Sequence, residues 1–536
     1  MKKVKKVARI LLCMVVCMSI LAGCGGTGSQ DTTPAGNEPA SSTSNPSDAT
    51  ETPSTPPADA KYAKEMTIYS LPCSVIDPGN PAFYTAQVAW YCNNVYNTLV
   101  KLTSDWELKP ALATSWETDD YQTYVFKLRD DVYFHNGEKF TADDVVFTIE
   151  RGKQSKGTGA YDRWSQVESY EVVNDYEIIL KAKTVNVDFI NDVAAFHGCS
   201  ILNREAVEAD PDHGTWIGTG PWIVKDLVVK EYVEFTRNDK YWGELPKTEK
   251  LTFKNIPEQS AQLIALENGE IDSVQGLLPI YLMDLEKDDR FEKQKFTITN
   301  TAMIAFNMLD PLMSDINFRM AVAYAISRDD CVATTRSGYA IPANHMWGYD
   351  TQFKNTDIKP IERDIEKAKE YLAKTNYKGE TIQIVAALND HISNAQVIQA
   401  NLKEIGINTE IYQTDLPGLA AYTPWGGTKH QMMVGSSSWT NVASSCKNIY
   451  YPGMSGNKAN YDNPKVKELL DKATTTTDEK EREAIYKEVQ EIVAQDMPYI
   501  PIFNMVYVIV SQKGVGGLDT YTSLNHDFSY AYRVIE

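Results

Sequence analysis

Residues 381–412 read TIQIVAALNDHISNAQVIQANLKEIGINTEIY, and the hydrophobic pattern changes twice within this stretch. Thr381–Ala387 is a short apolar run typical of a buried strand, whereas Asn394–Ile405 places its apolar residues on one helical face. Ile407–Tyr412 follows as a second strand after Gly406, a residue type that commonly ends helices. Because parallel strands need a crossover of about this length, the stretch predicts a strand–helix–strand unit and an α/β protein.

The chain after residue 61 continues this mixed pattern over about 475 residues, too many for one hydrophobic core, so two or three domains are expected. Further strands are predicted at Tyr62–Leu71, Tyr124–Leu128, Val167–Val173, Glu177–Lys183, Val224–Thr236, Lys250–Ile256 and Val506–Val510. Further helices are predicted at Ala86–Thr98, after the cap residue Thr141, and at Gln259–Asn268, Phe318–Ile326, Ile365–Ala373, Val466–Ala473 and Asp478–Ala494.

The N-terminus has the pattern of an export signal. Five basic residues up to Arg9 precede the apolar run Ile10–Leu21, which is shorter than the ~20 residues needed to span a bilayer. The run ends in Leu-Ala-Gly-Cys, which resembles a bacterial lipobox. We therefore expect residues 1–23 to be a lipoprotein signal peptide and Cys24 to become the lipidated first residue. An ordinary signal peptide cut at another small residue is the alternative.

Residues 24–61 are predicted to be a disordered tether, because residues 25–60 contain no Lys, Arg or large apolar side chain. Removal of the five positive charges in residues 1–23 would change the formal net charge from −20 to −25. Such an acidic chain is not expected to bind nucleic acid or to dock electrostatically on anionic lipid. Its contact with the membrane is expected through the lipid anchor.

Five of the eight cysteines follow the tether and show no CxxC spacing. Most are expected to be buried free thiols, although oxidation of one pair outside the cell stays open. The sequence contains no GxSxG, HExxH or phosphate-binding loop, so no catalytic residue is assigned. The histidines are scattered, no metal site or cofactor is predicted, and His430 is expected to be a surface residue.

Eight segments, in order and spacing, resemble the dipeptide/oligopeptide class of solute-binding proteins of ABC importers, known as family 5. No single segment is decisive, but together they cover the chain from about residue 62 to its end. The segments are NVYNTLV (94–100), KPALATSWE (109–117), YVFKLRDDVYFHNGEKFTADDV (124–145), TGPWIV (219–224), RNDKYWG (237–243), ALENGEID (265–272), IAFN with NFRMAVAYAISR (304–307 and 317–328), and AQDMPYIPIF (494–503).

This resemblance implies a two-lobed periplasmic-binding-protein fold, with an extra domain inserted in lobe I and a hinge between the lobes. Two strand-like crossovers would fall near Asn307 and Ile500. The implied boundaries are residues 62–105, 218–307 and 500–536 for lobe I, 106–217 for the inserted domain, and 308–499 for lobe II. The expected function is capture of a small solute between the lobes by a monomer and its delivery to the transmembrane permease subunits.

Several motif residues are given structural roles instead of ligand-binding roles. TGPW is interpreted as a turn, RNDKYWG as a hairpin corner around a packed Trp242, and Phe134–His135 as a turn in the inserted domain. Arg319 and Arg328 are expected to form internal ion pairs.

The predicted binding segment departs from the peptide-binding members that it resembles. Those members commonly hold the α-amino group of the ligand with an aspartate three residues after a tryptophan. Here Trp439 fits the pattern, but the aspartate position holds Val442. A buried ammonium group needs a paired carboxylate, so this departure puts a peptide with a free amine in doubt. The candidate ligand-binding residues are Trp439, Asn441, Trp425, Thr440 and Trp347.

A peptide or peptide-like molecule is the first expectation for the ligand. The flat apolar tryptophans suit the side chains of a peptide, and they equally suit sugars, blocked peptides and quaternary amines. An oligosaccharide or a metal complex such as one of nickel or haem is the alternative. A receptor that senses a signalling peptide would share the same fold and cleft. An exported enzyme is the remaining class, and turnover of a substrate by the purified protein would support it.

Overall fold

A computed structural model describes the chain from residue 57 onward with short gaps, and the export signal and Cys24 lie outside the described residues. Within the part that it describes, no helix is both long enough and apolar enough to cross a membrane. The described residues are 57, 59–80, 88–103, 107–156, 158–349, 351–439, 442–520 and 526–535.

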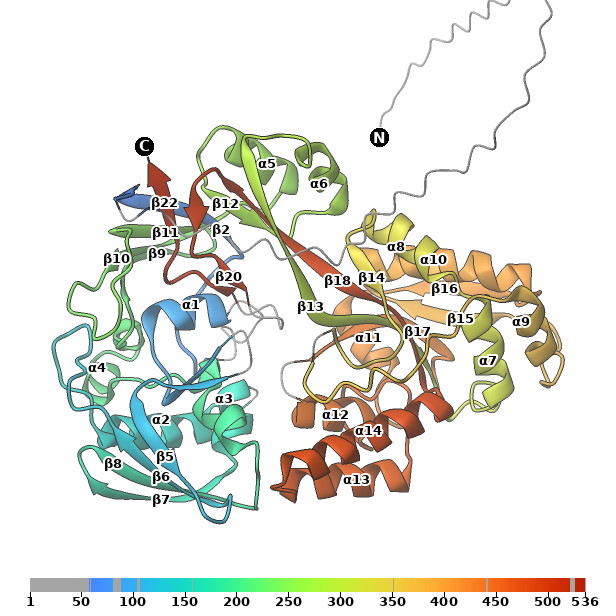
Figure 1. The fold of residues 1–536 in the computed structure, drawn as a ribbon, viewed down its shortest axis with the longest axis horizontal. Helices are drawn as coiled ribbons and strands as arrows, with labels where there is room; N and C mark the ends of the chain where they lie inside the picture. Colours follow the sequence, from blue (N-terminus) through green and yellow to red (C-terminus); the bar gives the residue numbers. More distant parts are fainter. Residues whose placement is uncertain are drawn as a thin grey trace, which may run out of the picture. The chain divides into compact units, whose positions relative to one another are not determined.

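One large mixed sheet of 11 strands dominates the structure (Figure 1). The strand β14 (Ala340–Pro342) pairs with β18 beside the main order of strands. That order is β16 (Thr409–Gln413), β15 (Ile382–Ala386), β17 (Met432–Ser438), β13 (Phe291–Phe306), β18 (Tyr499–Gln512), β12 (Ser273–Gln275), β2 (Glu65–Ser70), β11 (Lys250–Asn255), β10 (Tyr232–Arg237) and β9 (Trp222–Val228).

A second, four-stranded antiparallel sheet lies within residues 113–182. Its order is β5 (Ala113–Glu117), β6 (Thr123–Leu128), β8 (Glu177–Ala182) and β7 (Val167–Asn174). Three smaller sheets consist of β1 (Lys61–Tyr62), β22 (Tyr532–Ile535) and β19 (Val515–Gly516), of β3 (Val100–Leu102) and β4 (Leu108–Pro110), and of β20 (Asp519–Thr520) and β21 (His526–Asp527).

The helices cover these sheets in groups that follow the chain order. The first group is α1 (Val88–Val95), α2 (Ala142–Gln154), α3 (Gly159–Trp164), α4 (Arg204–Ala209), α5 (Gln259–Glu267) and α6 (Pro279–Leu285). The second group is α7 (Ile316–Ala325), α8 (Arg328–Arg336), α9 (Ile365–Leu372), α10 (Asn389–Glu404), α11 (Leu416–Tyr422), α12 (Val442–Tyr450), α13 (Pro464–Thr475) and α14 (Glu479–Asp496).

The long strands β13 and β18 belong to both halves of the large sheet, and Figure 1 shows them running between the two halves. They pair antiparallel from Phe291 opposite Gln512 to Ala305 opposite Tyr499. The register shifts between Thr297 and Thr301, and again between Ala302 and Met303. These irregularities lie inside the strands, before Asn307, near which one crossover was predicted. Irregular pairing of this kind bends a strand locally.

The strand–helix–strand unit is confirmed. β15 and β16 pair in parallel, α10 connects them, and Gly406 ends the helix with a φ of +85°. The single strand predicted for Val224–Thr236 is wrong, because β9 and β10 form an antiparallel hairpin there. Lys230, with a φ of +61°, makes the turn, and the sequence carries no glycine or asparagine to announce it.

Five buried apolar clusters fill the protein. One holds residues between Leu99 and Ile201 and packs on the four-stranded sheet. Two combine residues from the chain near Met66 with residues from its C-terminal part, such as Ile509 and Val510. The remaining two consist of residues between Ala302 and Phe503. The large sheet is therefore covered by separate cores on its two halves.

The TGPW segment packs as the predicted turn. A Cβ atom on Gly218 would lie 2.0 Å from the carbonyl oxygen of Val95, so only glycine fits against the end of α1. The Gly218 amide donates to Nδ1 of His135, which leaves Nε2 to donate to the Gly220 carbonyl at 3.0 Å. Trp242 of RNDKYWG packs against the cluster of the four-stranded sheet, as expected.

The expectation that the two arginines of the 317–328 motif form internal ion pairs is wrong. Arg319 is buried and donates to the carbonyl oxygens of Asp496 and Met313. Arg328 donates to the carbonyls of Pro501 and Ile361. Burial lowers the pKa of both guanidinium groups. Each arginine therefore ties separate backbone segments together through carbonyl groups, a role that residue spacing does not reveal.

The five cysteines in the described part of the chain are buried and unpaired, which confirms the expectation of buried thiols. Burial raises the pKa of Cys73 and of Cys331 to about 12. Both groups stay protonated at neutral pH and are poor nucleophiles.

Acid is expected to destabilise the fold. Burial lowers the pKa of His197 and His526 to about 3 and that of His345 to about 4, all below the value of 6.5 in the unfolded chain. The stability from these neutral histidines is complete above pH 6.5 and decreases as the pH falls, by about 2 kcal/mol each at pH 5. Burial raises the pKa of Asp144 and Asp192 to about 6. Protonation of each carboxyl group in the folded protein therefore returns about 1.4 kcal/mol of the free energy of unfolding at pH 5. The free energy of unfolding should therefore fall by about 3 kcal/mol between pH 7 and pH 5. Urea denaturation at both pH values measures this, and an equal or higher value at pH 5 would contradict it.

Candidate functional site

Two candidate tryptophans meet in the half of the sheet that contains β17. The rings of Trp347 and Trp439 lie 4.6 Å apart between centroids, at an interplanar angle of 36°. Trp439 follows the end of β17, and Trp347 follows β14 in the segment that precedes α9. Both side chains are almost fully buried, with exposed fractions of 0% and 1%. Residues 92 positions apart thus form one aromatic unit.

Hydrogen bonds fix this aromatic unit to β13 at the point where the register of that strand shifts. The amide of Trp439 donates to the carbonyl of Thr299 at 2.9 Å, and the Thr299 hydroxyl donates back to the carbonyl of Trp439. Gly348 lies beside the same threonine, and a Cβ atom there would be 3.0 Å from the Cβ of Thr299. Thr299 lies between Thr297 and Thr301, where the register of β13 shifts, so the tryptophan pair is tied to β13 at this irregularity.

The aromatic unit continues into helices α12 and α14. The ring centroid of Trp347 lies 6.5 Å from that of Tyr450 and 6.0 Å from that of Tyr486. The ring of Tyr486 stacks on that of Phe353, with 5.5 Å between centroids. Trp347 also lines a cavity of about 120 Å³ together with His345 and residues of α14. The tryptophan pair is therefore one wall of a larger aromatic region and not an isolated contact.

The Trp439 indole carries an unused hydrogen-bond donor. Its Nε1 is buried and has no acceptor within the described part of the structure. The indole of Trp347, in contrast, donates to the carbonyl of Gln352 at 3.2 Å. A buried donor without an acceptor costs about 1–3 kcal/mol, and an acceptor supplied by a bound molecule would recover this.

The other candidates lie elsewhere or outside the described residues. Trp425 is 37% exposed on the loop after α11, whereas the tryptophan pair is buried. The amide of the next residue, Gly426, donates to Asn460 Oδ1 at 2.6 Å, which holds the loop. Thr440 and Asn441 are not among the described residues. Val442 begins α12, and its side chain packs in the same buried cluster as Trp439.

His430 is buried, so its expected place at the surface is wrong. Its Nε2 lies 3.0 Å from the carbonyl of Lys458, and burial lowers its pKa. The residue therefore connects two loops. Groups of at least three His, Cys, Asp or Glu side chains placed to hold a metal ion are not found in the described ranges.

A charged contact joins the aromatic region to the segment after β8. Asp188 lies 3.6 Å from Arg482 of α14, and Val187 donates its amide to the carbonyl of Thr474 at 3.2 Å. Burial raises the pKa of Asp188, against the opposing charges of Arg482 and Lys447. These residues link the chain near the four-stranded sheet to helices that pack beside the tryptophans.

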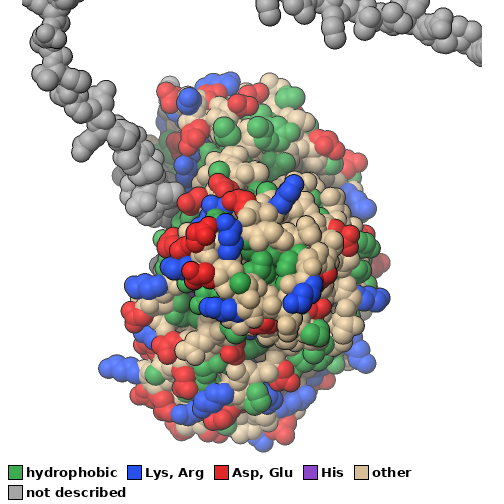
Figure 2. Space-filling model, turned by 90° about the vertical axis from the view of Figure 1, so that its right-hand side faces the viewer, with side chains coloured by type: hydrophobic (Ala, Val, Ile, Leu, Met, Phe, Trp, Pro, Cys, Tyr) green, Lys and Arg blue, Asp and Glu red, His purple; other side chains and the backbone are tan. Residues whose placement is uncertain are grey.

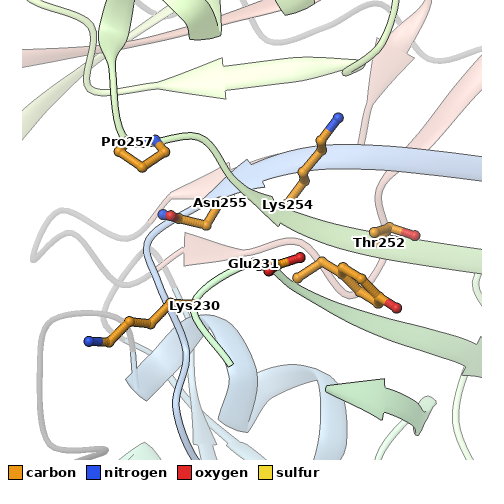
Figure 3. A pocket seen from close by; sticks show the side chains of 7 residues that line it. Lys230, Glu231, Thr252, Lys254, Asn255 and Pro257 are labelled. Atoms are coloured by element: carbon orange, nitrogen blue, oxygen red, sulfur yellow. The ribbon is translucent and has the colours of Figure 1, made fainter. Parts of the chain in front are cut away.

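A second recess of about 380 Å³ lies on the outer half of the large sheet (Figure 3). Lys230, Glu231, Lys254 and Asn255 line it, and Figure 3 shows the two lysines pointing in different directions. Asn255 already donates through its side chain to the carbonyl of Ser70. No feature of this recess matches the unused donor and paired aromatic rings around Trp439, so we do not choose it as the site.

Comparison with known proteins defines the class of this fold. The chain superposes on the ABC transporter substrate-binding protein CtaP of Listeria monocytogenes with a TM-score of 0.78, at 24% identity, over 88% of this chain and all of that one. It superposes on the ABC transporter-associated periplasmic binding protein DppA of Helicobacter pylori, in complex with the peptide STSA, with a TM-score of 0.75, at 26% identity, over 89% and 99% of the two chains. The fold is thus the two-lobed, mixed α/β fold that the sequence predicted.

Residues 107–461 match the family of bacterial extracellular solute-binding proteins, family 5. The chain is also 25% identical to the nickel-binding periplasmic protein of Escherichia coli strain K12, over 83% of this chain and 90% of that relative. The protein therefore belongs to family 5 of the bacterial extracellular solute-binding proteins, as a substrate-binding protein of an ABC transporter. Members of this family serve transport by binding and are not enzymes, which confirms the non-enzymatic prediction.

Thr299, Gly348, Asp188 and Arg482 are residues of this region that the sequence did not suggest. Thr299 bonds Trp439 through both its carbonyl and its hydroxyl, and Gly348 lies close against this threonine. Asp188 and Arg482 are 294 positions apart, and each resembles an ordinary surface charge in its local sequence.

Proposed function

We propose that this protein is the lipid-anchored, extracytoplasmic binding component of an ABC importer, and that it captures a peptide or peptide-like solute beside Trp439 and Trp347. The packed tryptophan pair carries this proposal, because Trp347 lines a cavity and the adjoining Trp439 holds a buried Nε1 donor that a solute carbonyl would satisfy. The aromatic rings around it supply apolar surface for the rest of the solute. DppA of Helicobacter pylori, whose structure contains a peptide, shares this fold.

The proposed division into lobes follows the implied boundaries. Lobe I would comprise residues 62–105, 218–307 and 500–536, the inserted domain 106–217, and lobe II 308–499. The separate buried clusters support this division, since one lies within residues 99–201 and two lie within residues 302–503. Closure of the lobes around a solute would bend β13 and β18 at the shifted registers.

A thermal-shift screen of the soluble chain beginning at Lys61 tests the proposed ligand class. The panel contains free peptides, N-acetylated peptides, oligosaccharides, and nickel and haem complexes. A ligand at 100 times its dissociation constant adds about 2.7 kcal/mol, which raises the unfolding midpoint by several degrees. We expect peptides to shift the midpoint, and N-acetylated peptides to do so more strongly, because Val442 offers no charge to an ammonium group.

Other results of the same screen favour the alternatives. A shift with nickel complexes alone would favour nickel binding, as in the Escherichia coli relative, and a shift with oligosaccharides alone would favour sugar capture. Peptide binding without loss of peptide uptake after gene deletion would favour a signalling receptor. No shift with any peptide would contradict the proposed solute.

Replacing Cys24 with alanine tests the anchor. We expect the parent chain to fractionate with the membrane and the C24A variant to appear in the soluble extracytoplasmic fraction, because the lipid would have no thiol to modify. Cys13→Ala is the matched control within the predicted signal, and it should leave the fractionation unchanged. Membrane retention of C24A at the parent level would contradict a lipid anchor at this residue.

A further inference from the structure

The segment between β8 and the short helical turn Ile190–Ala194 touches helices α13 and α14. Val187 donates its amide to the carbonyl of Thr474 at the end of α13, at 3.2 Å. The carboxylate of Asp188 lies 3.6 Å from the guanidinium of Arg482 on α14. Both charged side chains are mostly buried, with exposed fractions of 14% and 15%. Two backbone groups and one pair of opposite charges thus join parts of the chain that are nearly 300 residues apart.

This ion pair is incompletely satisfied. At 3.6 Å the two groups attract one another without a hydrogen bond, and Asp188 Oδ2 and Arg482 Nε are buried without a partner among the described atoms. Lys447 of α12 adds a second positive charge near Asp188, while Asp192 of the same segment adds a negative one. A buried pair of this kind contributes little net stability, but removal of either member leaves an uncompensated buried charge. Its effect is therefore to favour one relative position of the two parts.

We propose that Asp188 and Arg482, with the Val187–Thr474 hydrogen bond, form a latch that holds the inserted domain against lobe II. The latch makes both residues positioning residues for solute capture, a consequence that rests on the proposed function. In an open arrangement both charges would be hydrated and independent. The apparent affinity for a solute scales with the fraction of molecules in the binding-competent arrangement, so the latch would raise affinity without touching the solute.

The two members of the latch are not equivalent. The Arg482 guanidinium also lies over the Phe353 ring, 5.4 Å from its centroid, and keeps this contact when Asp188 is changed. Asp188 would keep only the more distant positive charge of Lys447 and would remain buried near Asp192, of like charge. Loss of Arg482 should therefore open the protein more than loss of Asp188.

The test measures the separation of the two parts in the full chain without any solute. Nitroxide labels are placed at Glu171 on β7 and Glu366 on α9, both exposed, and pulsed electron spin resonance gives the distance distribution. The variants are Asp188→Asn, Arg482→Gln, their combination, and Arg482→Lys, which keeps the charge. Arg363→Gln is the matched control, because Arg363 pairs with Glu404 inside lobe II.

We expect the parent to show one short distance, and both single variants to gain a longer one, with the closed-to-open ratio falling about tenfold for Arg482→Gln and less for Asp188→Asn. The double variant should open less than the two single effects combined, and Arg482→Lys should lie between Arg482→Gln and the parent. Arg363→Gln should resemble the parent.

The latch would be overturned if the parent already showed mainly the longer label-to-label distance. It would also be overturned if the distance distributions of the single variants matched that of the parent. Equal unfolding midpoints for parent and variants exclude misfolding as the cause of a shift. The label distances are measured without any solute, so the result does not depend on the proposed transport role. Shifted distances together with no bound solute in the screen would keep the latch and contradict the proposed function.

Discussion

Replacing Trp439 with alanine is expected to lower the free energy of unfolding by about 3–5 kcal/mol, the usual cost of truncating a buried tryptophan. The side chain is fully buried against Trp347, and the backbone on either side is tied to Thr299 at the bend of β13. Urea denaturation measures the loss. Trp425→Ala is the matched control, since that side chain is 37% exposed, and it should cost much less.

Trp439→Phe separates packing from ligand recognition. Phenylalanine keeps most of the aromatic contact with Trp347 but removes the Nε1 donor, which has no partner in the described structure. The loss of stability should therefore be much smaller than for alanine, because no satisfied hydrogen bond is broken. The affinity for the solute found in the screen should fall about tenfold by calorimetry, since one hydrogen bond to the solute is lost. Unchanged affinity would remove this donor from the binding site.

Replacing Arg319 with methionine is expected to lower the free energy of unfolding by about 4 kcal/mol. Methionine retains the length and the apolar stem, so packing changes little, but the carbonyls of Asp496 and Met313 lose a charged donor in the interior. These carbonyls end α14 and precede α7, so their loss should loosen the joint between the two helices. Urea denaturation followed by circular dichroism provides the measurement.

Arg290→Met is the control for this prediction. Arg290 forms its ion pair with Asp288 at the surface, and this variant should unfold near the parent midpoint. A small effect of Arg319→Met would mean that water replaces the arginine.

The local sequence was sufficient to predict a helix or strand wherever that element buries one face of regularly spaced apolar residues. The β15–α10–β16 unit is an example, because its apolar spacing and Gly406 determine the strands, the helix and its end. The β9–β10 hairpin was missed because its turn uses Lys230 in a left-handed conformation, which few sequences announce. His430 was misjudged because a lone histidine carries no local sign of burial.

The candidate site could be predicted only in part for the same reason. The sequence pointed to Trp439 and Trp347 separately, as flat apolar side chains in different segments, but their contact depends on how β17 and β14 join the large sheet. The role of Thr299 requires the register shift in β13, and that of Arg482 requires a contact across 294 positions. Tertiary arrangement, and not residue type, decides these features.

The pairing of β1 with β22 decides where a mechanical load would enter the protein. Lys61 lies opposite Ile535, and the Ala63 amide donates to the carbonyl of Arg533. A pull on the chain before residue 61 would thus fall first on a few backbone hydrogen bonds between the two ends of the folded body. β18 ends at Gln512, shortly before β19 (Val515–Gly516), which pairs with β22, and the register shifts of β13 and β18 lie further along these strands. Under the proposed lipid anchor, tension on the tether would therefore fall first on the hydrogen bonds between the chain ends.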